Sequence, residues 1–166
     1  MRSKQTGLWE LLRSQRLDVL ALQETLLKAT DWDLSVRDYL CFSALGHTAA
    51  SQRGVSILVD RNLNSQVVGP SSPFWVFVRV SGTAHPTPVI IGSVYLPHQD
   101  AQQLTRRRLA AALVHIHAKS PNCAIILMGD LNADLEGSQR LAQDSPGTFE
   151  VLANQGGVPT SRRTGG

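Results

Sequence analysis

The sequence predicts an α/β (α+β) domain in which a mixed β-sheet is layered with helices. Short apolar runs, each about as long as one strand, occupy most of the chain up to residue 96. The segment at residues 100–119 changes to the helical period, and one more apolar run follows it at residues 123–130. Several strands follow one another through connections too short for a parallel crossover, which favours antiparallel neighbours and disfavours a Rossmann fold.

The first half of the chain is predicted to form one short helix followed by five strands. Leu8, Leu11 and Leu12 have the spacing i, i+3, i+4, so residues 7–16 are expected to form an amphipathic helix. The strands are predicted at residues 17–25, 39–45, 54–60, 74–80 and 88–96. Because short connections join the last three, we expect them to be antiparallel neighbours in one sheet.

The second half is predicted to form a long helix, a strand and a short helix. Four apolar residues of the long helix have helical spacing, namely Leu109, Ala112, Leu113 and Ile116. We expect Asp100 to cap this helix at its start and Pro121 to stop it. The apolar run at 123–130 is too short for a buried helix, so it is predicted to be a central strand. Residues 148–157 are predicted to form a short helix closed by glycines.

Length and composition predict a single domain, residues 1–166, with one sizeable core. Hydrophobic residues make up 42% of the chain, which excludes a disordered tail. No apolar run approaches the roughly 18 residues that a membrane helix needs, and the start is not typical of a signal peptide. We therefore expect an intracellular protein, nuclear or cytoplasmic, that does not span a membrane. Cys41 and Cys123 lie in apolar runs and are expected to be buried free thiols.

The chain carries a small positive charge that is nearly all arginine. Sixteen Lys and Arg against thirteen Asp and Glu give a net charge of +3. Arginine suits bidentate contact with phosphate, but a charge of this size does not by itself identify a nucleic-acid partner. Two interpretations stay open for a basic group on the long helix and near the C-terminus: contact with a nucleic-acid backbone, or a solvated face. Its members are Arg106, Arg107, Arg108, Arg162 and Arg163.

Polar residues that could carry chemistry follow three of the predicted strands. They are Glu24 after the first strand, Tyr95 and His98 at the end of the fifth, and Asp130 and Asn132 after the last. Catalytic groups are often set at strand ends, because the strand fixes their position while the loop keeps them accessible. A carboxylate just past a buried strand is costly unless it is solvated, paired or bound to a cation.

The segment GDLN at residues 129–132 is the most specific of these. Gly129 allows the backbone to turn sharply, and a locally extended chain would point Asp130 and Asn132 to the same side. A carboxylate and an amide arranged in this way suit a hard cation such as Mg²⁺ and a phosphate oxygen. The alternative is a turn that the Asp and Asn side chains merely stabilise.

The order of these motifs resembles the endonuclease/exonuclease/phosphatase superfamily, which has the fold of deoxyribonuclease I. The matching segments are LQET (22–25), RGVSILV (53–59), VYLP (94–97) and ILMGDLNAD (126–134). The similarity runs in the family's order from about Leu8 to Asp134, and the motifs look most like the endonuclease domain of non-LTR retrotransposons. The resemblance implies a layered β-sandwich flanked by helices.

By this resemblance, four residues would form the catalytic site. Glu24 would be the carboxylate that binds Mg²⁺, with Mn²⁺ as the alternative ion. Tyr95 would hydrogen-bond the scissile phosphate or its neighbour, although a tyrosine that only caps the sheet core is the alternative. Asp130 would orient or deprotonate the attacking water, or protonate the leaving group. Asn132 would donate to the phosphate oxygen that gains charge in the transition state.

The sequence departs from the family's pattern at both ends of the domain. The family's first strand, which bears an asparagine, and its closing Asp–His pair are not recognised in residues 1–166. We therefore expect a domain that lacks the first strand and the C-terminal strands, and a very low or absent nuclease activity of residues 1–166. His98 is the nearest candidate to replace the missing histidine, but none of the five histidines is predicted to be catalytic.

The resemblance implies an Mg²⁺-dependent phosphodiester hydrolase, in the first place a DNA endonuclease of the retrotransposon type. Nucleic acid, DNA above all, is the expected partner, and neither a membrane nor a protein partner is inferred. One alternative is a truncated, catalytically inactive relic that binds metal or nucleic acid weakly. A phosphoinositide or sphingomyelin phosphodiesterase ranks last, because no lipid-recognition segment is recognised.

Overall fold

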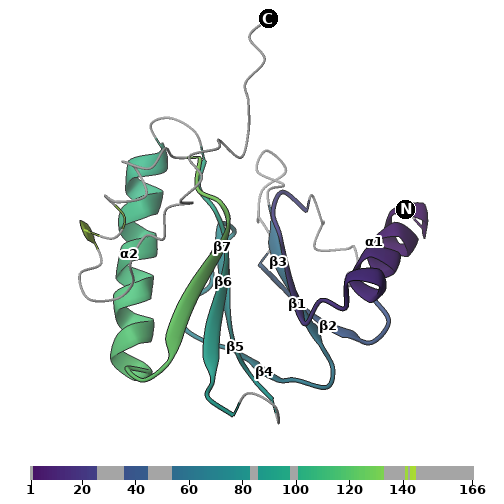
Figure 1. Cartoon of the computed structure of the whole chain (residues 1–166). Coiled ribbons are helices and arrows are strands. Elements are labelled where there is room, and N and C mark those ends of the chain that lie inside the picture. The colour runs from purple at the N-terminus through teal and green to yellow at the C-terminus, as the bar shows by residue number, and fades with distance from the viewer. Residues whose placement is uncertain are drawn as a thin grey trace, which may run out of the picture.

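Two β-sheets face each other in the computed structural model, and a helix covers the outer face of each sheet (Figure 1). The structure describes residues 2–25, 36–44, 54–82, 86–97, 101–132, 141 and 143–144. Its helices are α1 (Arg2–Gln15) and α2 (Ala101–Lys119). Its strands are β1 (Val19–Leu22), β2 (Tyr39–Ala44), β3 (Val55–Asp60), β4 (Asn64–Val67), β5 (Trp75–Ser81), β6 (Val89–Tyr95) and β7 (Ala124–Asp130). Neither of these described helices is long and apolar enough to cross a membrane.

The two sheets differ in the direction of their strands. The first sheet has the order β1-β3-β2, and both of its pairs are antiparallel. The second has the order β4-β5-β6-β7, in which β6 and β7 run parallel and the other pairs are antiparallel. A parallel pair needs a crossover connection, and α2 supplies it along the outer face of the sheet. Strands β6 and β7 therefore end at the same edge of the second sheet.

Apolar clusters fill the spaces between these layers, because side chains along a strand alternate between its two faces. Ile57 of β3 and Val78 of β5 are fully buried in the cluster between the two sheets. Leu58 of β3 belongs instead to the cluster with Leu12 of α1, and both side chains are fully buried. The alternation thus gives each sheet one face toward the other sheet and one toward a helix.

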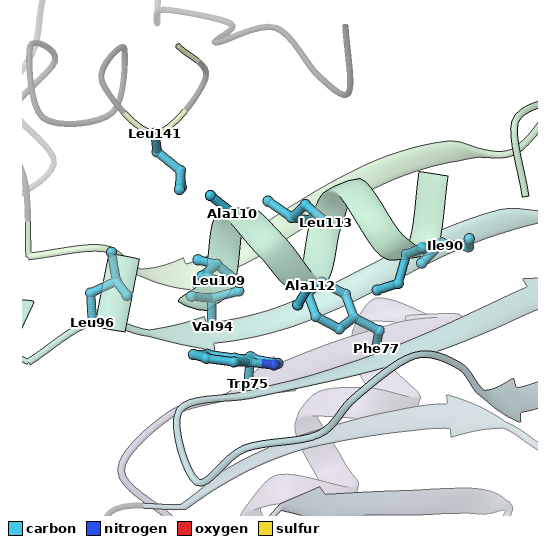
Figure 2. Close-up of a cluster of buried hydrophobic side chains, with 11 residues drawn as sticks. Trp75, Phe77, Ile90, Val94, Leu96, Leu109, Ala110, Ala112, Leu113 and Leu141 are labelled. Carbon is cyan, nitrogen blue, oxygen red and sulfur yellow. The ribbon is translucent and has the colours of Figure 1, made fainter. Parts of the chain in front are cut away.

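The cluster between α2 and the second sheet holds that helix against β5 and β6. Figure 2 shows Ala112 of α2 beside Phe77 of β5, and Leu109 beside Val94 of β6. Leu109, Phe77 and Val94 are all fully buried. The indole N–H of Trp75 is satisfied as well, since it donates to a backbone carbonyl at 3.0 Å. This packing fixes the crossover helix and, with it, the strands on either side of it.

The cluster between α1 and the first sheet contains a tyrosine with altered acidity. Tyr39 is buried, and its hydroxyl donates a hydrogen bond of 2.6 Å to the carbonyl oxygen of Leu17. Burial raises the pKa of Tyr39 above its usual value, and the nearby carboxylates of Asp60, Asp18 and Asp38 raise it further. The folded state therefore favours the neutral hydroxyl.

The predicted layered fold is confirmed, but the expected sheet neighbours are wrong at one point. The segment at 54–60 forms β3, which pairs with β1 and β2 and lies in a different sheet from β5. The chain passes between the sheets through β4, a strand that pairs with β5 and that the sequence did not predict. Its sequence NSQV is mostly exposed, so it carries no apolar signal.

The expectation of a central strand at 123–130 is also wrong. This run forms β7, which lies at the edge of the second sheet among the described residues, and Ile126 is 48% exposed. Its apolar composition has another cause, since β7 packs on both faces. Ile125 and Leu127 pack toward α2, whereas Met128 packs between the sheets.

Three smaller expectations complete the comparison. Cys41 and Cys123 are free thiols as predicted, but each is half-buried rather than buried. The reason is that Cys41 lies on an outer strand of its sheet and Cys123 precedes the edge strand β7. Asp100, the expected cap of α2, and the expected helix at 148–157 lie outside the described residues.

Candidate functional site

The ends of β6 and β7 bring two of the predicted residues side by side. In the parallel register Tyr95 is the direct partner of Asp130. Beyond that pair, the N–H of Leu96 donates to the carbonyl oxygen of Asp130 at 2.9 Å, so the two chains stay joined as they leave the sheet. Asp130 is exposed, while Tyr95 is only 4% exposed and packs in the cluster between the sheets.

Gly129 sets the backbone direction just before Asp130. Its φ is +138°, a conformation that is open to glycine and strained for other residues. A Cβ at this position would overlap the carbonyl oxygen of Val94, its register partner in β6. Gly129 thus combines an unusual φ with a close approach of two backbones, but it stays within β7, and the chain turns only after Asp130.

Asp130 and Asn132 are joined by a local turn. The backbone N–H of Asn132 donates to Oδ1 of Asp130 at 2.9 Å, and Asn132 has a φ of +45°. The expectation that an extended chain would align the two side chains is therefore wrong, because the carboxylate draws the chain into a turn. The side-chain amide of Asn132 donates to the carbonyl oxygen of Leu96 at 2.7 Å, which ties the turn back to the end of β6.

Glu24 reaches this end of the molecule from the facing sheet. β1 ends at Leu22, and the next residue, Gln23, donates from Nε2 to Oγ of Ser93 at 3.1 Å. The Ser93 hydroxyl donates in turn to the carbonyl oxygen of Leu22 at 3.2 Å. Ser93 is fully buried and precedes Tyr95 by two positions in β6, so the start of the Glu24 loop is anchored beside the end of β6. Glu24 itself is exposed, with a φ of +49°.

Sequence reasoning did not identify the Gln23–Ser93 link between the two sheets. The available signal was a lone serine inside the apolar run of β6, VIIGSVY. A buried hydroxyl needs a hydrogen-bond partner, and here its partners come from the other sheet. Ser93 thus acts as a positioning residue for the loop that carries Glu24.

Two carboxylates, Glu24 and Asp130, come to this end of the sandwich. Among the residues that the structure describes, there is no group of three or more His, Cys, Asp or Glu side chains arranged to hold a metal. A closed zinc cage needs such a group, whereas Mg²⁺ is usually held by one or two carboxylates together with waters and substrate phosphate. The donor set therefore fits Mg²⁺ or Mn²⁺ better than zinc.

The predicted basic residues and histidines give less support to a nucleic-acid site than the residues at the strand ends do. Arg106 forms an ion pair of 2.9 Å with Asp144 and its side chain is only 20% exposed, so it is engaged within the chain. Arg107 and Arg108 are exposed on the first half of α2. Arg162, Arg163 and His98 lie outside the described residues, as do the other two loop histidines.

The match to a known family covers nearly the whole sequence. The sequence profile of the Endonuclease/Exonuclease/phosphatase family matches residues 2–165. No curated protein sequence matches the chain with significance. The predicted family resemblance is thereby confirmed at the level of the superfamily.

Solved structures with a similar fold come from several organisms. One is the AP endonuclease LMAP from Leishmania major, with a TM-score of 0.68, 14% identity, and 87% of this chain and 62% of that chain covered. Another is the human Nocturnin catalytic domain with bound sulfate, with a TM-score of 0.63, 15% identity, and 87% and 63% covered. A third is D. rerio TDP2 complexed with a single-strand DNA product, with a TM-score of 0.57, 16% identity, and 83% and 57% covered. The present chain thus has the fold of these proteins and spans 57–63% of their length.

Proposed function

We propose, because this chain belongs to the Endonuclease/Exonuclease/phosphatase family, that it hydrolyses phosphodiester bonds of nucleic acid with the help of a divalent cation. The observation that carries the proposal is the junction at the ends of β6 and β7. There Tyr95 pairs with Asp130, and Asn132 is hydrogen-bonded to both strands. Phosphodiester hydrolysis needs a proton acceptor and a donor to phosphate within reach of one another, and this junction supplies a carboxylate and an amide.

Glu24 is the residue that would hold the cation. Mg²⁺ is the preferred ion because the donor is a carboxylate, and Mn²⁺ would accept the same donor. When bound, it would offset the negative charge on the phosphate and act as a Lewis acid toward a phosphate oxygen. The Gln23–Ser93 bond supports this assignment, since it anchors the Glu24 loop beside the end of β6.

The turn at Asp130 favours a division of roles between the two polar side chains. Asp130 keeps a fixed orientation because Oδ1 accepts the N–H of Asn132, and its carboxylate would accept the proton of the attacking water. The amide of Asn132, held at the end of β6, would donate to the phosphate oxygen that gains charge. Tyr95 would contribute its hydroxyl from the buried side of the same junction.

We further propose that the substrate is DNA and that the chain is an endonuclease of the retrotransposon type. The motifs LQET, RGVSILV, VYLP and GDLN support this narrower assignment. Two proteins of similar fold are, by name, an AP endonuclease and a TDP2 bound to a single-strand DNA product, which is consistent with a DNA substrate here.

Plasmid nicking tests the proposal. Nicking of supercoiled plasmid by the chain should require Mg²⁺ and be abolished by EDTA, and Asp130→Asn should lower its rate by about 10²–10⁴-fold. The matched control is Asp60→Asn, because Asp60 makes the same turn at the end of β3, where its Oδ1 accepts the N–H of Asn62 at 2.7 Å. This control should retain wild-type activity.

The outcomes separate the competing interpretations. Equal loss of activity in both aspartate variants would contradict the assignment of the site, since a local turn would then explain the effect. Hydrolysis of phosphoinositide or sphingomyelin in place of DNA would favour the lipid phosphodiesterase. Cation binding without hydrolysis of any of these substrates would favour a catalytically inactive protein.

A further inference from the structure

A concavity lies at the opposite end of the second sheet from the candidate site. Its volume is about 560 Å³, and it is formed where β6 and β7 begin and α2 ends. The residues that matter here are Arg79, Thr87, Lys119, Ser120, Asn122 and Cys123. Because β6 and β7 are parallel strands of seven residues each, their starts and ends are separated by roughly 20 Å. The two sites are therefore separate.

This concavity is cationic. Arg79 and Lys119 line it, and no Asp or Glu is among the described residues of its wall. Neither of these two side chains makes a hydrogen bond or an ion pair with any residue that the structure describes. Thr87, Ser120 and Asn122 add neutral side chains that can donate hydrogen bonds.

Arg79 occupies an unusual position in its strand. The residues of β5 on either side of it are buried, and it alone is exposed within that buried run. Phe77 and Trp75, two and four positions earlier, pack toward α2. Because side chains alternate along a strand, Arg79 lies on the same face of β5 as Phe77 and Trp75. At the position of Arg79 along the sheet, α2 has already ended. A guanidinium there faces the concavity instead of an apolar neighbour.

The C-terminus of α2 carries partial negative charge, which would oppose an anion. In this structure two of the last four carbonyl oxygens of the helix accept a backbone N–H. The N–H of Ser120 donates to the carbonyl oxygens of Ile116 at 2.9 Å and His117 at 3.2 Å, and the N–H of Cys123 donates to Ser120 at 3.0 Å. The full charges at the concavity are those of Arg79 and Lys119.

We propose that this concavity binds the phosphate group of a nucleotide or of a nucleic-acid strand. Arg79 supplies a planar, forked donor that matches phosphate oxygens, and Lys119 adds a second positive charge. The inference does not depend on the proposed hydrolytic activity, because it uses other residues at the other end of the sheet.

Cys123 lines the concavity and provides a direct readout of occupancy. In a Cys41→Ser background it is the single thiol of the chain, so its rate of alkylation by iodoacetamide is measured without interference. The probes are inorganic phosphate, a 5′-mononucleotide and a short single-stranded oligonucleotide, each at an ionic strength matched with chloride. A ligand at about ten times its Kd fills about nine-tenths of the sites, so it should slow alkylation about tenfold.

Two variants test the cations, and two serve as controls. Arg79→Gln and Lys119→Gln should each abolish protection of Cys123. Arg13→Gln, which removes a guanidinium stacked over Trp9 of α1, and Asp130→Asn at the candidate site should both retain it. Protection by phosphate and the mononucleotide would identify a free ligand, whereas protection by the oligonucleotide alone would identify a strand. The inference is overturned if no probe protects Cys123, if protection persists in both cation variants, or if Asp130→Asn removes it.

Discussion

Replacing Gly129 by alanine should destabilise the protein by several kcal/mol, although it adds one methyl group. The residue has a φ of +138°, and the added Cβ would overlap the carbonyl oxygen of Val94. Backbone strain of this kind costs about 1–3 kcal/mol, and overpacking against a neighbour that cannot move costs about 1–3 kcal/mol more. Together they give about 2–6 kcal/mol, a large share of the roughly 5–15 kcal/mol that a domain has.

Gly7 offers a matched control for this substitution. It lies within α1, is exposed, and has no atom within 4 Å of the position that a Cβ would take. Gly7→Ala should therefore stabilise the protein by about 0.5–1 kcal/mol, because alanine loses less entropy in a helix. The same chemical change is thus expected to have opposite signs at the two positions.

Urea unfolding followed by circular dichroism measures both effects. The midpoint should fall in Gly129→Ala and rise in Gly7→Ala, with an unchanged m-value if neither change alters the unfolding transition itself. A Gly129→Ala variant within about 0.5 kcal/mol of wild type, the usual scatter of neutral surface changes, would refute the reasoning. It would mean that the β6–β7 junction tolerates a shift, and the fixed geometry proposed for Asp130 would lose its support.

Three further predictions concern the site and the core. Glu24→Gln should weaken Mg²⁺ binding in a calorimetric titration. Asn132→Ala should leave Mg²⁺ binding unchanged and lower any hydrolysis, since the amide is proposed to act on the transition state. Equal Mg²⁺ affinity of Glu24→Gln and wild type would contradict the role of Glu24. Ser93→Ala leaves Gln23 without its buried hydrogen-bond partner, so the variant should lose about 1–3 kcal/mol of stability in urea unfolding. The variant should also bind Mg²⁺ more weakly. A loss of stability with unchanged Mg²⁺ binding would show that Ser93 does not position the Glu24 loop. The pKa of Tyr39 is raised in the folded state, so its contribution to stability is complete below the unfolded-state pKa near 10. That contribution is lost as the pH rises through the folded-state pKa. Tyr39→Phe should therefore flatten the loss of thermal stability at alkaline pH.

The layers of the fold were predictable because they depend on patterns that each segment carries by itself. Leu12 of α1 and the apolar runs of β3 and β5 are buried, as their patterns predict. Leu11, which the helical spacing also assigned to the buried face, is 46% exposed. Sheet membership was not predictable in the same way. β3 and β5 have equally apolar sequences, and the polar strand β4 between them determines that they belong to different sheets.

The candidate site, too, could be predicted from the sequence only in part. Tyr95 and Asp130 could be predicted to meet, since each ends an apolar strand and parallel strands end at one edge. The form of the turn after Asp130 could not, because an Asp-x-Asn segment is compatible with an extended chain as well as with a side chain that captures the backbone N–H. The same three-residue pattern forms the same hydrogen bond at Asp60, at the end of β3 and away from the β6–β7 junction. The turn is therefore a local property of the pattern, and the chemistry proposed for Asp130 depends on the junction of β6 and β7 around it.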